Sequence, residues 1–378
     1  MASKIPVKHD TDIDSFSSSN GPNVKVIARF RPLDKAESSF RGRPASIQFL
    51  PDNSTLFFSS TELKPDVASL SKLRTYPPTS SAPGKTKAIF TFDRVFTPES
   101  TQQELFDYAL KDTVDDLFNG YNGCVLAYGQ TGSGKTYTMM GPASPEISHA
   151  TNSNVETIFK IIDNSPKDIQ YKVQISYMEI YQEKVRDFVS PPASTYNLPI
   201  HESSTKGVYV KDLTEMEASS LEDVLSIMET GARLRSTGST LMNLQSSRSH
   251  AIFSLKLSQR SLITQAQKAG QLFLVDLAGS ENIKKTGASG QALQESKLIN
   301  KSLSALGNII NSLTDPNSSH VPYRDSKLTR VLQEAIGGNS RTSLIITCSP
   351  SSLDEVETLT TLRFGSRAKK IRNKAIIN

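Results

Sequence analysis

Gly129-Gln130-Thr131-Gly132-Ser133-Gly134-Lys135-Thr136 fits the phosphate-binding pattern G-x-x-x-x-G-K-[ST] at every position. Glycines let the backbone curve around a polyphosphate, so that successive N–H groups and a helix N-terminus point at its negative charge. Lys135 adds a full positive charge, and the hydroxyl of Thr136 is a ligand for Mg2+. At average residue usage the pattern arises by chance in about one chain in a hundred of this length. The stretch therefore predicts a site for a nucleoside triphosphate.

The residues on either side have the order that such a loop requires. An apolar run typical of a short buried strand precedes it, Cys124-Val125-Leu126-Ala127-Tyr128, and a helix is predicted to begin in Thr136-Tyr137-Thr138-Met139-Met140. Strand, loop and helix in this order are the structural context of the motif. An ordinary glycine-rich turn is therefore the weaker interpretation.

The composition of the 378 residues is that of a globular protein. Apolar residues make up 37% and charged residues 21%, which allows a sizeable buried core. No apolar run reaches the length of a membrane span, and the polar start lacks the apolar centre of a signal peptide, which predicts a cytosolic or nuclear protein. Cys124 and Cys348 lie in apolar runs and are predicted to be buried free thiols. The net charge of +5 permits an acidic partner, either nucleic acid or a protein surface, without choosing one.

Strands and helices are predicted to alternate along the chain. Residues 1–22 have the composition of a disordered arm, and residues 59–88, rich in Pro and Ser, are predicted to form a long surface loop. Apolar patterns predict strands at 24–30, 90–96, 173–181, 250–258, 271–276 and 343–348. Helical spacing predicts helices at 221–234, at 293–313, and from the capping box of Thr101 and Glu104 to Asn119-Gly120. This order favours a three-layer α/β domain with the phosphate loop at the carboxyl ends of its strands.

Two further stretches carry groups that nucleotide hydrolysis needs. An apolar strand delivers Asp276 to the edge of the predicted sheet, where a carboxylate can hold Mg2+ through water, and Gly279 offers an amide that can approach a terminal phosphate. Alone, the D-x-x-G pattern is weak, and an unrelated turn is the better interpretation. The run Ser246-Ser247-Arg248-Ser249-His250 places hydroxyls and a guanidinium before a strand, with a polar capping loop as the plain alternative.

Four stretches in the same order resemble the kinesin motor domain. They are residues 128–139, 246–250, 275–281 and 320–329, and the match extends from about residue 23 to residue 378, where residues 371–378 resemble the start of the neck linker. Phrases such as those at 287–290, 300–307 and 337–342 resemble conventional kinesins in their fungal form. The resemblance implies a P-loop NTPase fold with a mixed, mostly parallel sheet between two helical layers.

The resemblance also implies an activity and partners. It implies an N-terminal motor that is a microtubule-stimulated Mg-ATPase, moves toward the plus end, and resides on the microtubules of the cytoplasm. No nucleic-acid partner and no membrane insertion are implied. The full-length chain is expected to be a homodimer through a coiled coil beyond these residues, and this fragment a monomer.

Nucleotide contacts implied by the resemblance fall into three groups. The phosphates of ATP or ADP are held by Gln130, Thr131, Gly132, Ser133, Gly134, Lys135 and Thr136. Mg2+ is coordinated by Thr136 and Ser247, with Asp276 behind the metal's water. The adenine side is formed by Arg29, Arg31 and Pro32, with Tyr137 stacking on the other face of the base; a strand end and a core tyrosine are the plain alternative.

The implied catalytic residues lie in two loops, one with residues 246–250 and one with residues 275–281, which are called the switch loops below. Ser246 helps to position the attacking water, and the Gly279 amide senses the terminal phosphate. Arg248 and Glu281 form a salt bridge that closes only when both loops fold over that phosphate. Because buried charge pairs are costly to make and to break, such a bridge suits a latch. A solvated surface arginine is the alternative for Arg248.

Basic residues that follow the switch region are the implied contacts with the acidic microtubule surface. They are Lys284, Lys285, Lys297, Lys301, Arg324, Lys327 and Arg330, with Lys184 and Arg186 as weaker candidates. For any single lysine a solvated face is the commoner outcome, so the hypothesis depends on the group.

Two other functions are compatible with parts of the sequence. A microtubule-binding module with little hydrolysis is disfavoured because every implied catalytic residue is present. An unrelated P-loop GTPase or kinase is disfavoured because the chain has no Asn-Lys-x-Asp guanine motif. Two segments depart from the family pattern: residues 142–150 lack the expected Gly-Ile-Ile-Pro-Arg phrase, and the loop at 59–88 is longer than the usual turn.

Overall fold

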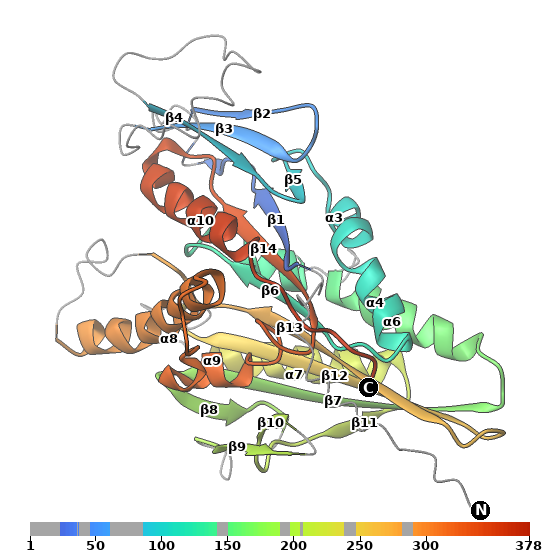
Figure 1. Ribbon diagram of the computed structural model, residues 1–378. Coiled ribbons are helices and arrows are strands. Elements are labelled where there is room, and N and C mark those ends of the chain that lie inside the picture. Colours follow the sequence, from blue (N-terminus) through green and yellow to red (C-terminus); the bar gives the residue numbers. More distant parts are fainter. Residues whose placement is uncertain are drawn as a thin grey trace, which may run out of the picture.

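The computed structural model describes residues 23–35, 37, 46–60, 86–141, 150–189, 197–204, 207–237, 247–281 and 290–378. Within them a nine-stranded sheet forms the middle of the molecule (Figure 1). Its strand order is β11-β7-β12-β13-β6-β14-β1-β5, and β8 pairs with β7. The strands are β1 (Lys25–Phe30), β5 (Arg94–Phe96), β6 (Gly123–Tyr128), β7 (Ile169–Tyr181), β8 (Lys184–Asp187), β11 (Met216–Ala218), β12 (His250–Ser261), β13 (Gln267–Asp276) and β14 (Arg341–Cys348).

Two small sheets and the helices surround this central sheet. The small sheets consist of β2 (Ser46–Phe49), β3 (Thr55–Ser60) and β4 (Thr86–Thr91), and of β9 (Ile200–Ser203) and β10 (Gly207–Val210). The α-helices are α3 (Gln102–Ala109), α4 (Lys111–Phe118), α5 (Lys135–Met140), α6 (Ala150–Asp163), α7 (Leu221–Thr237), α8 (Gly290–Thr314), α9 (Lys327–Val331) and α10 (Glu355–Ala368). Two 3-10 turns, η3 (Tyr323–Asp325) and η4 (Ser352–Asp354), precede α9 and α10.

Alternating side chains of the central strands fill two cores, one on each face of the sheet. In β6, Cys124 and Leu126 join the core that includes α8 and α10, whereas Val125 and Ala127 join the core that includes α3, α4, α6 and α7. Because successive strand residues point to opposite faces, a strand that is apolar at every position is covered on both sides. The predicted three-layer α/β fold is confirmed.

The parallel pairings gather in the half of the sheet that carries the phosphate loop. There β6 pairs with β13 and β14, and β1 pairs with β14 and β5, all in parallel, whereas the pairs among β7, β8, β11, β12 and β13 are antiparallel. Parallel strands bring their carboxyl ends to one edge. Tyr128 of β6 and Asp276 of β13 end at this edge, so the loop leaves the sheet beside the carboxylate.

Some element boundaries differ from the sequence-based predictions. The capping box of Thr101 and Glu104 is present, but the predicted long helix is divided into α3 and α4 at Leu110, whose φ of −121° is not helical. The predicted strand at 90–96 is divided between β4 and β5, because Asp93 turns to exchange hydrogen bonds with the backbone of Val26.

The predictions for whole segments have different outcomes. The ends of the predicted loop at 59–88 belong to β3 and β4, while its centre, the arm at 1–22 and residues 142–149 lie outside the described residues. Cys124 and Cys348 are free and buried, as predicted. In the described ranges the structure has no helix with the length and apolarity of a membrane span.

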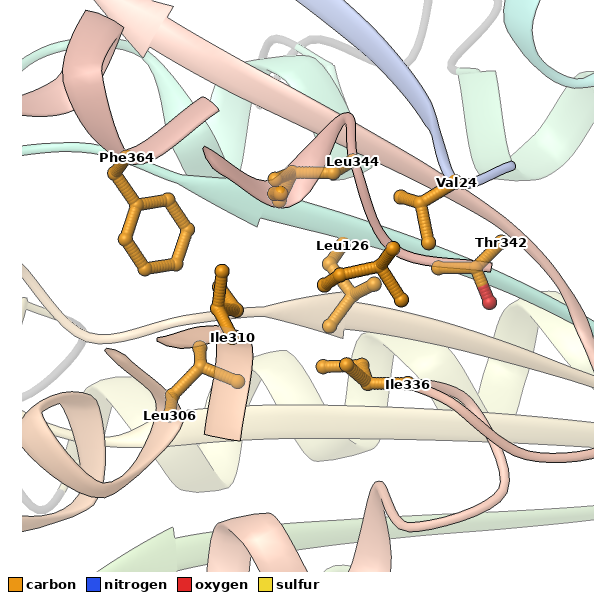
Figure 2. Close-up of a pocket in the computed structure, with 10 residues that line it drawn as sticks. Val24, Leu126, Leu306, Ile310, Ile336, Thr342, Leu344 and Phe364 are labelled. Carbon is orange, nitrogen blue, oxygen red and sulfur yellow. The ribbon is translucent and has the colours of Figure 1, made fainter. Parts of the chain in front are cut away.

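A small apolar cavity lies in the core beneath α8. It has a volume of about 20 Å³ and is lined by side chains of β6, β14, α8, α10 and neighbouring segments (Figure 2). Leu306 and Ile310 of α8 border it, together with Phe364 of α10. Because a void offers no atoms to the side chains around it, packing holds this part of α8 less tightly than a filled core would.

The segment after α10 lies along the core and is hydrogen bonded at several points. The Val24 amide donates to Ile371 at 3.0 Å, and the Asn378 amide donates to Gly120 at 2.9 Å. The buried Asn373 side chain accepts from the Gly337 amide at 2.8 Å and donates to three groups, the nearest being the Ser340 carbonyl at 2.7 Å. Residues 371–378 are therefore held by both backbone and side-chain bonds.

Candidate functional site

The phosphate loop connects β6 to α5 and closes around its own lysine. Gly134, at the start of α5, has φ of 101°, a conformation that residues with a Cβ rarely adopt. The Nζ of Lys135 donates to the carbonyls of Gly129 at 2.9 Å and Gln130 at 2.8 Å. The predicted loop therefore forms a ring of backbone groups around one buried ammonium.

The charge of Lys135 is poorly compensated by the protein. Its side chain is buried, and burial lowers the Lys135 pKa to about 8, although the carboxylates of Asp276 and Glu281 act in the opposite direction. A polyphosphate in the loop would supply the missing negative charge, because an opposite charge nearby favours the charged form.

The predicted Mg2+ residues meet at the end of β13. The Thr136 hydroxyl donates to Oδ2 of Asp276 at 2.7 Å, and Arg235 of α7 donates to the same oxygen at 2.7 Å. Oδ1 of Asp276 is buried and has no hydrogen-bond partner within the described ranges. Buried polar atoms are normally paired, and Mg2+ prefers carboxylate, hydroxyl and water oxygens. Thr136 and Asp276 therefore fit a hydrated Mg2+. The Ser247 carbonyl accepts from the Gly279 amide at 2.8 Å, and the role of the Ser247 hydroxyl as a metal ligand stays a prediction.

In this structure Glu281 bonds the phosphate loop rather than Arg248. Its carboxylate accepts from the amide of Thr131 at 2.8 Å and from the Thr131 hydroxyl at 2.6 Å. Gly279 lies under this pair, since a Cβ there would stand 2.3 Å from Oε2 of Glu281. A residue with a Cβ at this position would require the Glu281 and Thr131 side chains to move apart. The Arg248–Glu281 bridge, expected over a terminal phosphate, is open here and stays a prediction.

Arg29 and Tyr137 of the predicted adenine side lie together. The guanidinium carbon of Arg29 is 5.3 Å from the centre of the Tyr137 ring, and Arg29 donates to the Thr138 hydroxyl at 3.1 Å. Burial lowers the Arg29 pKa to about 10. The Tyr137 residue is 48% exposed, so a flat base has room to stack on its ring. Gln102, which the sequence did not single out, donates to the carbonyl of Tyr137 at 3.0 Å.

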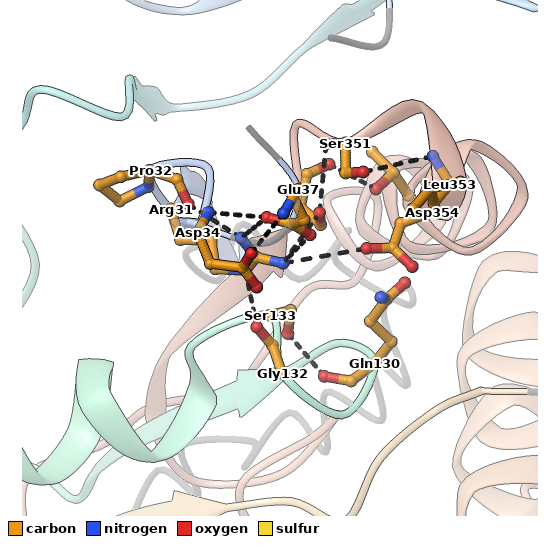
Figure 3. A network of polar contacts seen from close by, with 12 residues as sticks. Arg31, Pro32, Asp34, Glu37, Gln130, Gly132, Ser133, Ser351, Leu353 and Asp354 are labelled. Carbon is orange, nitrogen blue, oxygen red and sulfur yellow. Dashed lines mark hydrogen bonds and ion pairs between the residues drawn. The ribbon is translucent and has the colours of Figure 1, made fainter. Parts of the chain in front are cut away.

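Arg31, expected on the adenine side with the exposed Pro32, is bonded to the phosphate loop. Its Nε donates to the Gly132 carbonyl at 2.7 Å, and its two terminal nitrogens each donate to the carboxylate of Glu37 at 2.6 Å (Figure 3). The hydrogen bond with Arg31 lowers the Glu37 pKa and raises the Arg31 pKa. Ser133 is held separately, through its hydroxyl to the Gln130 carbonyl at 2.7 Å. Arg31 therefore positions the phosphate loop, with Glu37 as its charge partner.

The predicted track residues differ in how free their charges are. Lys297 and Lys301 are exposed on α8, and Arg324 is exposed in η3. Arg330 is mostly buried and pairs with Glu202 of β9, while Lys327, on the same helix α9, is half-buried. Of the weaker candidates, Lys184 is exposed, but Arg186 pairs at 3.1 Å with the fully buried Glu179. Ser246, Lys284 and Lys285 lie outside the described residues.

Besides Gln102, three residues without a predicted role lie in the site. Arg235 pairs with Asp276, Glu37 pairs with Arg31, and His250 bonds the turn that contains Gly279. Arg235 and Glu37 are charged residues in polar surroundings without a local pattern. His250 had a signal, since it closes the Ser-Ser-Arg-Ser-His run.

A lysine enclosed by the loop between a parallel strand and a helix, beside a threonine–aspartate pair, places the chain among the P-loop nucleoside triphosphatases. The family model of the kinesin motor domain matches residues 29–371. The chain therefore belongs to the kinesin motor domain family, whose members are ATP-hydrolysing motors stimulated by microtubules.

Individual relatives agree with this family. The chain is 51% identical over 363 residues to a kinesin heavy chain of Neurospora crassa, which covers 96% of this chain and 36% of the relative. It is 42% identical over 357 residues to a kinesin heavy chain of Drosophila melanogaster, covering 94% and 34%. A solved structure described as that of a fast kinesin, with implications for ATPase mechanism and microtubule interactions, matches at 50% identity with a TM-score of 0.82 over 94% of both chains. The chain thus spans about a third of the length of these heavy chains.

Nucleotide binding should take up a proton at alkaline pH. Above about pH 8 the free Lys135 loses its proton, and bound phosphates raise its pKa again, so affinity should fall by up to about tenfold per pH unit above that point. Calorimetry at about pH 9 in buffers of different ionisation enthalpy measures the proton. In Lys135→Arg the guanidinium stays charged, so the uptake should vanish. Equal heats in all buffers for the unaltered protein would contradict the role of Lys135.

Replacing Glu37 should loosen the phosphate loop. Glu37→Gln removes the nearer carboxylate of Arg31 and leaves only Asp354 at 3.9 Å, so we expect the free energy of unfolding to fall by about 1 kcal/mol and bound ADP to leave faster. Urea denaturation and release of a fluorescent ADP measure the two effects. The exposed Glu99 provides the matched control, Glu99→Gln, which should change neither. Unchanged stability in Glu37→Gln would show that the Arg31 pair is only a surface contact.

Proposed function

We propose that this chain is the ATPase and track-binding part of a longer, plus-end-directed microtubule motor that uses MgATP. The observation that carries the proposal is the direct contact between the phosphate loop and the Asp276–Glu281 turn, through Thr136 and Thr131. Groups that bind a nucleotide and groups that report its phosphates are thereby in one hydrogen-bonded unit.

Binding and hydrolysis would use the residues already in place. Lys135 and the loop amides hold the β and γ phosphates, while Thr136 and Ser247 coordinate Mg2+ with Asp276 behind its water. When bound, Mg2+ neutralises charge on the phosphate oxygens. Phosphoryl transfer depends mainly on positioning and charge stabilisation. Ser246, adjacent to Ser247, is proposed to orient the attacking water.

An exchange of hydrogen bonds supplies the phosphate sensor. The Gly279 amide now donates to the Ser247 carbonyl, and a terminal phosphate oxygen is a stronger acceptor for it. If Glu281 then leaves Thr131, its carboxylate becomes available to Arg248. Inverting a two-state equilibrium from 1:99 to 99:1 takes about 5.5 kcal/mol. A few charge-assisted bonds of about 1.5–3 kcal/mol each are sufficient.

The proposed track surface is formed by α8, η3 and α9 with the neighbouring β9–β10 sheet. These elements contact one another and lie on one side of the molecule (Figure 1). Lys297, Lys301 and Arg324 give this surface exposed positive charge that suits an acidic filament. Such attraction weakens as salt increases. Nucleic acid is the less favoured partner, and the motor is expected on cytoplasmic microtubules.

The proposed output element is the segment 371–378, the start of the neck linker. Its bonds to Gly120, Gly338 and Val24 anchor it to the core directly after α10. A lever after the motor suits movement toward the plus end. The remainder of the linker and the coiled coil that would make a homodimer belong to the part of the longer protein beyond these residues, and the fragment alone is proposed to be monomeric.

The test of this function combines ATPase and gliding measurements. The fragment extended through its neck should hydrolyse ATP faster with microtubules than without them, and should move polarity-marked microtubules with their minus ends leading. Glu281→Ala should bind ATP but lose most of the stimulation, by about 100-fold or more if the latch is needed in the transition state. Filament binding without stimulated hydrolysis in the unaltered protein would favour the alternative of a binding module.

Exposed Arg324 and its partner Glu202 provide a matched pair for the track surface. Arg324→Glu should weaken microtubule affinity by about fivefold at low ionic strength, and less as salt rises. Glu202→Gln releases Arg324 and Arg330 from a carboxylate, so affinity should increase. Cosedimentation over a salt series measures both. Equal microtubule affinity of the two variants would show that the filament binds at another face of the molecule.

A further inference from the structure

One buried imidazole bonds both the Ala278–Gly279 turn and helix α8. His250 is the first residue of β12 and is 2% exposed. Its Nδ1 accepts from the amide of Ala278 at 3.0 Å. Its Nε2 lies 2.7 Å from the hydroxyl of Ser302 on α8, and that hydroxyl donates to the Ile299 carbonyl at 2.6 Å.

These contacts determine where the protons are. A backbone amide can only donate, so Nδ1 of His250 carries no hydrogen and the neutral ring has its hydrogen on Nε2. Nε2 therefore donates to Ser302, whose own hydrogen goes to Ile299. Burial, together with the positive charges of Arg235 and Lys135, lowers the His250 pKa to about 3. The Ala278 amide, His250, Ser302 and the Ile299 carbonyl thus form a continuous series of hydrogen bonds. The imidazole keeps this one orientation throughout the neutral pH range.

The three elements joined by His250 are those that must move together in a motor. Ala278 directly precedes Gly279, the proposed phosphate sensor, whose amide bonds Ser247 on the other switch loop. Ser302 lies on the buried side of α8, next to the exposed Lys301. One turn further along α8, Leu306 borders the apolar cavity (Figure 2). The His250–Ser302 hydrogen bond therefore holds α8 near a place where a void leaves the packing incomplete.

We infer that His250 is a positioning residue that transmits displacement of the Ala278–Gly279 turn to α8 through Ser302. This inference rests on the proposed function and adds the link between its sensor and its track surface. A turn pulled toward a phosphate carries the imidazole or breaks its bond to Ser302, and in either case α8 and its exposed lysines change position relative to the sheet. The alternative is a core histidine that contributes stability alone.

The test compares Ser302→Ala with Ser304→Ala, a matched change at an exposed position of the same helix. The measured quantity is the ratio of microtubule dissociation constants with ADP and with a non-hydrolysable ATP analogue. Ser302→Ala should reduce this ratio by at least about fivefold, the lower end of measured coupling between sites, and Ser304→Ala should leave it unchanged. A reduced unfolding midpoint in Ser302→Ala with an unchanged ratio would overturn the inference.

A second variant separates the two bonds of the imidazole. In His250→Asn the shorter side chain can still accept from the Ala278 amide but does not reach Ser302. We expect the same reduced ratio, and no further reduction when it is combined with Ser302→Ala, because neighbours that act through one contact are not additive. Additive losses would contradict a single path. If the unaltered protein shows no difference between the two nucleotides, the proposed function fails instead, independently of His250.

Discussion

The carboxylate of Asp276 is the point on which the nucleotide site depends. It is 3% exposed, and one of its oxygens accepts from both Thr136 and Arg235, so it joins the phosphate loop, the end of β13 and helix α7. A buried ion pair contributes little net stability, but removal of one partner is strongly destabilising because it leaves a charge without compensation. The three elements therefore cannot separate without exposing or neutralising that charge. The second oxygen has no hydrogen-bond partner within the described ranges, so it could accept from a water of a bound Mg2+.

Several donors and acceptors at this site are already paired with one another across its loops. The Gly279 amide is held by the Ser247 carbonyl, the Ser280 amide by the Gly129 carbonyl, and the Glu281 carboxylate by Thr131. Two of these bonds link the phosphate loop to the Gly279–Glu281 turn, and the third links that turn to Ser247. Since the pairs are already satisfied, a bound phosphate gains only the difference between two acceptors. Such a site changes state with a small free-energy difference instead of binding irreversibly.

The elements that depend only on neighbouring residues could be predicted from short stretches of sequence. The β6–loop–α5 unit, the capping box before α3 and the position of Asp276 at a strand end follow from patterns within about ten residues. The break at Leu110 and the turn at Asp93 did not, because they result from packing and from a bond to a distant strand. The partners of the site residues were also beyond prediction: Thr131 and Glu281 are 150 positions apart, and His250 and Ser302 are 52 apart. Family resemblance assigned roles to motif residues, but Arg235 and Glu37 lie outside the motifs.

The position of β14 has a consequence for how the protein is made. This strand lies between β6 and β1, although it comes more than 200 residues after the one strand and 300 after the other, so the strand that leads into the phosphate loop keeps an open edge until residues 341–348 have been synthesised. β1 has β14 and β5 as its neighbours, so one of its edges also stays unpaired until β14 has been synthesised. An apolar strand edge exposed during synthesis invites pairing with other chains. Nascent chains should therefore depend on chaperones until translation has passed this strand, and any version that ends before it should aggregate instead of giving a smaller, weaker enzyme.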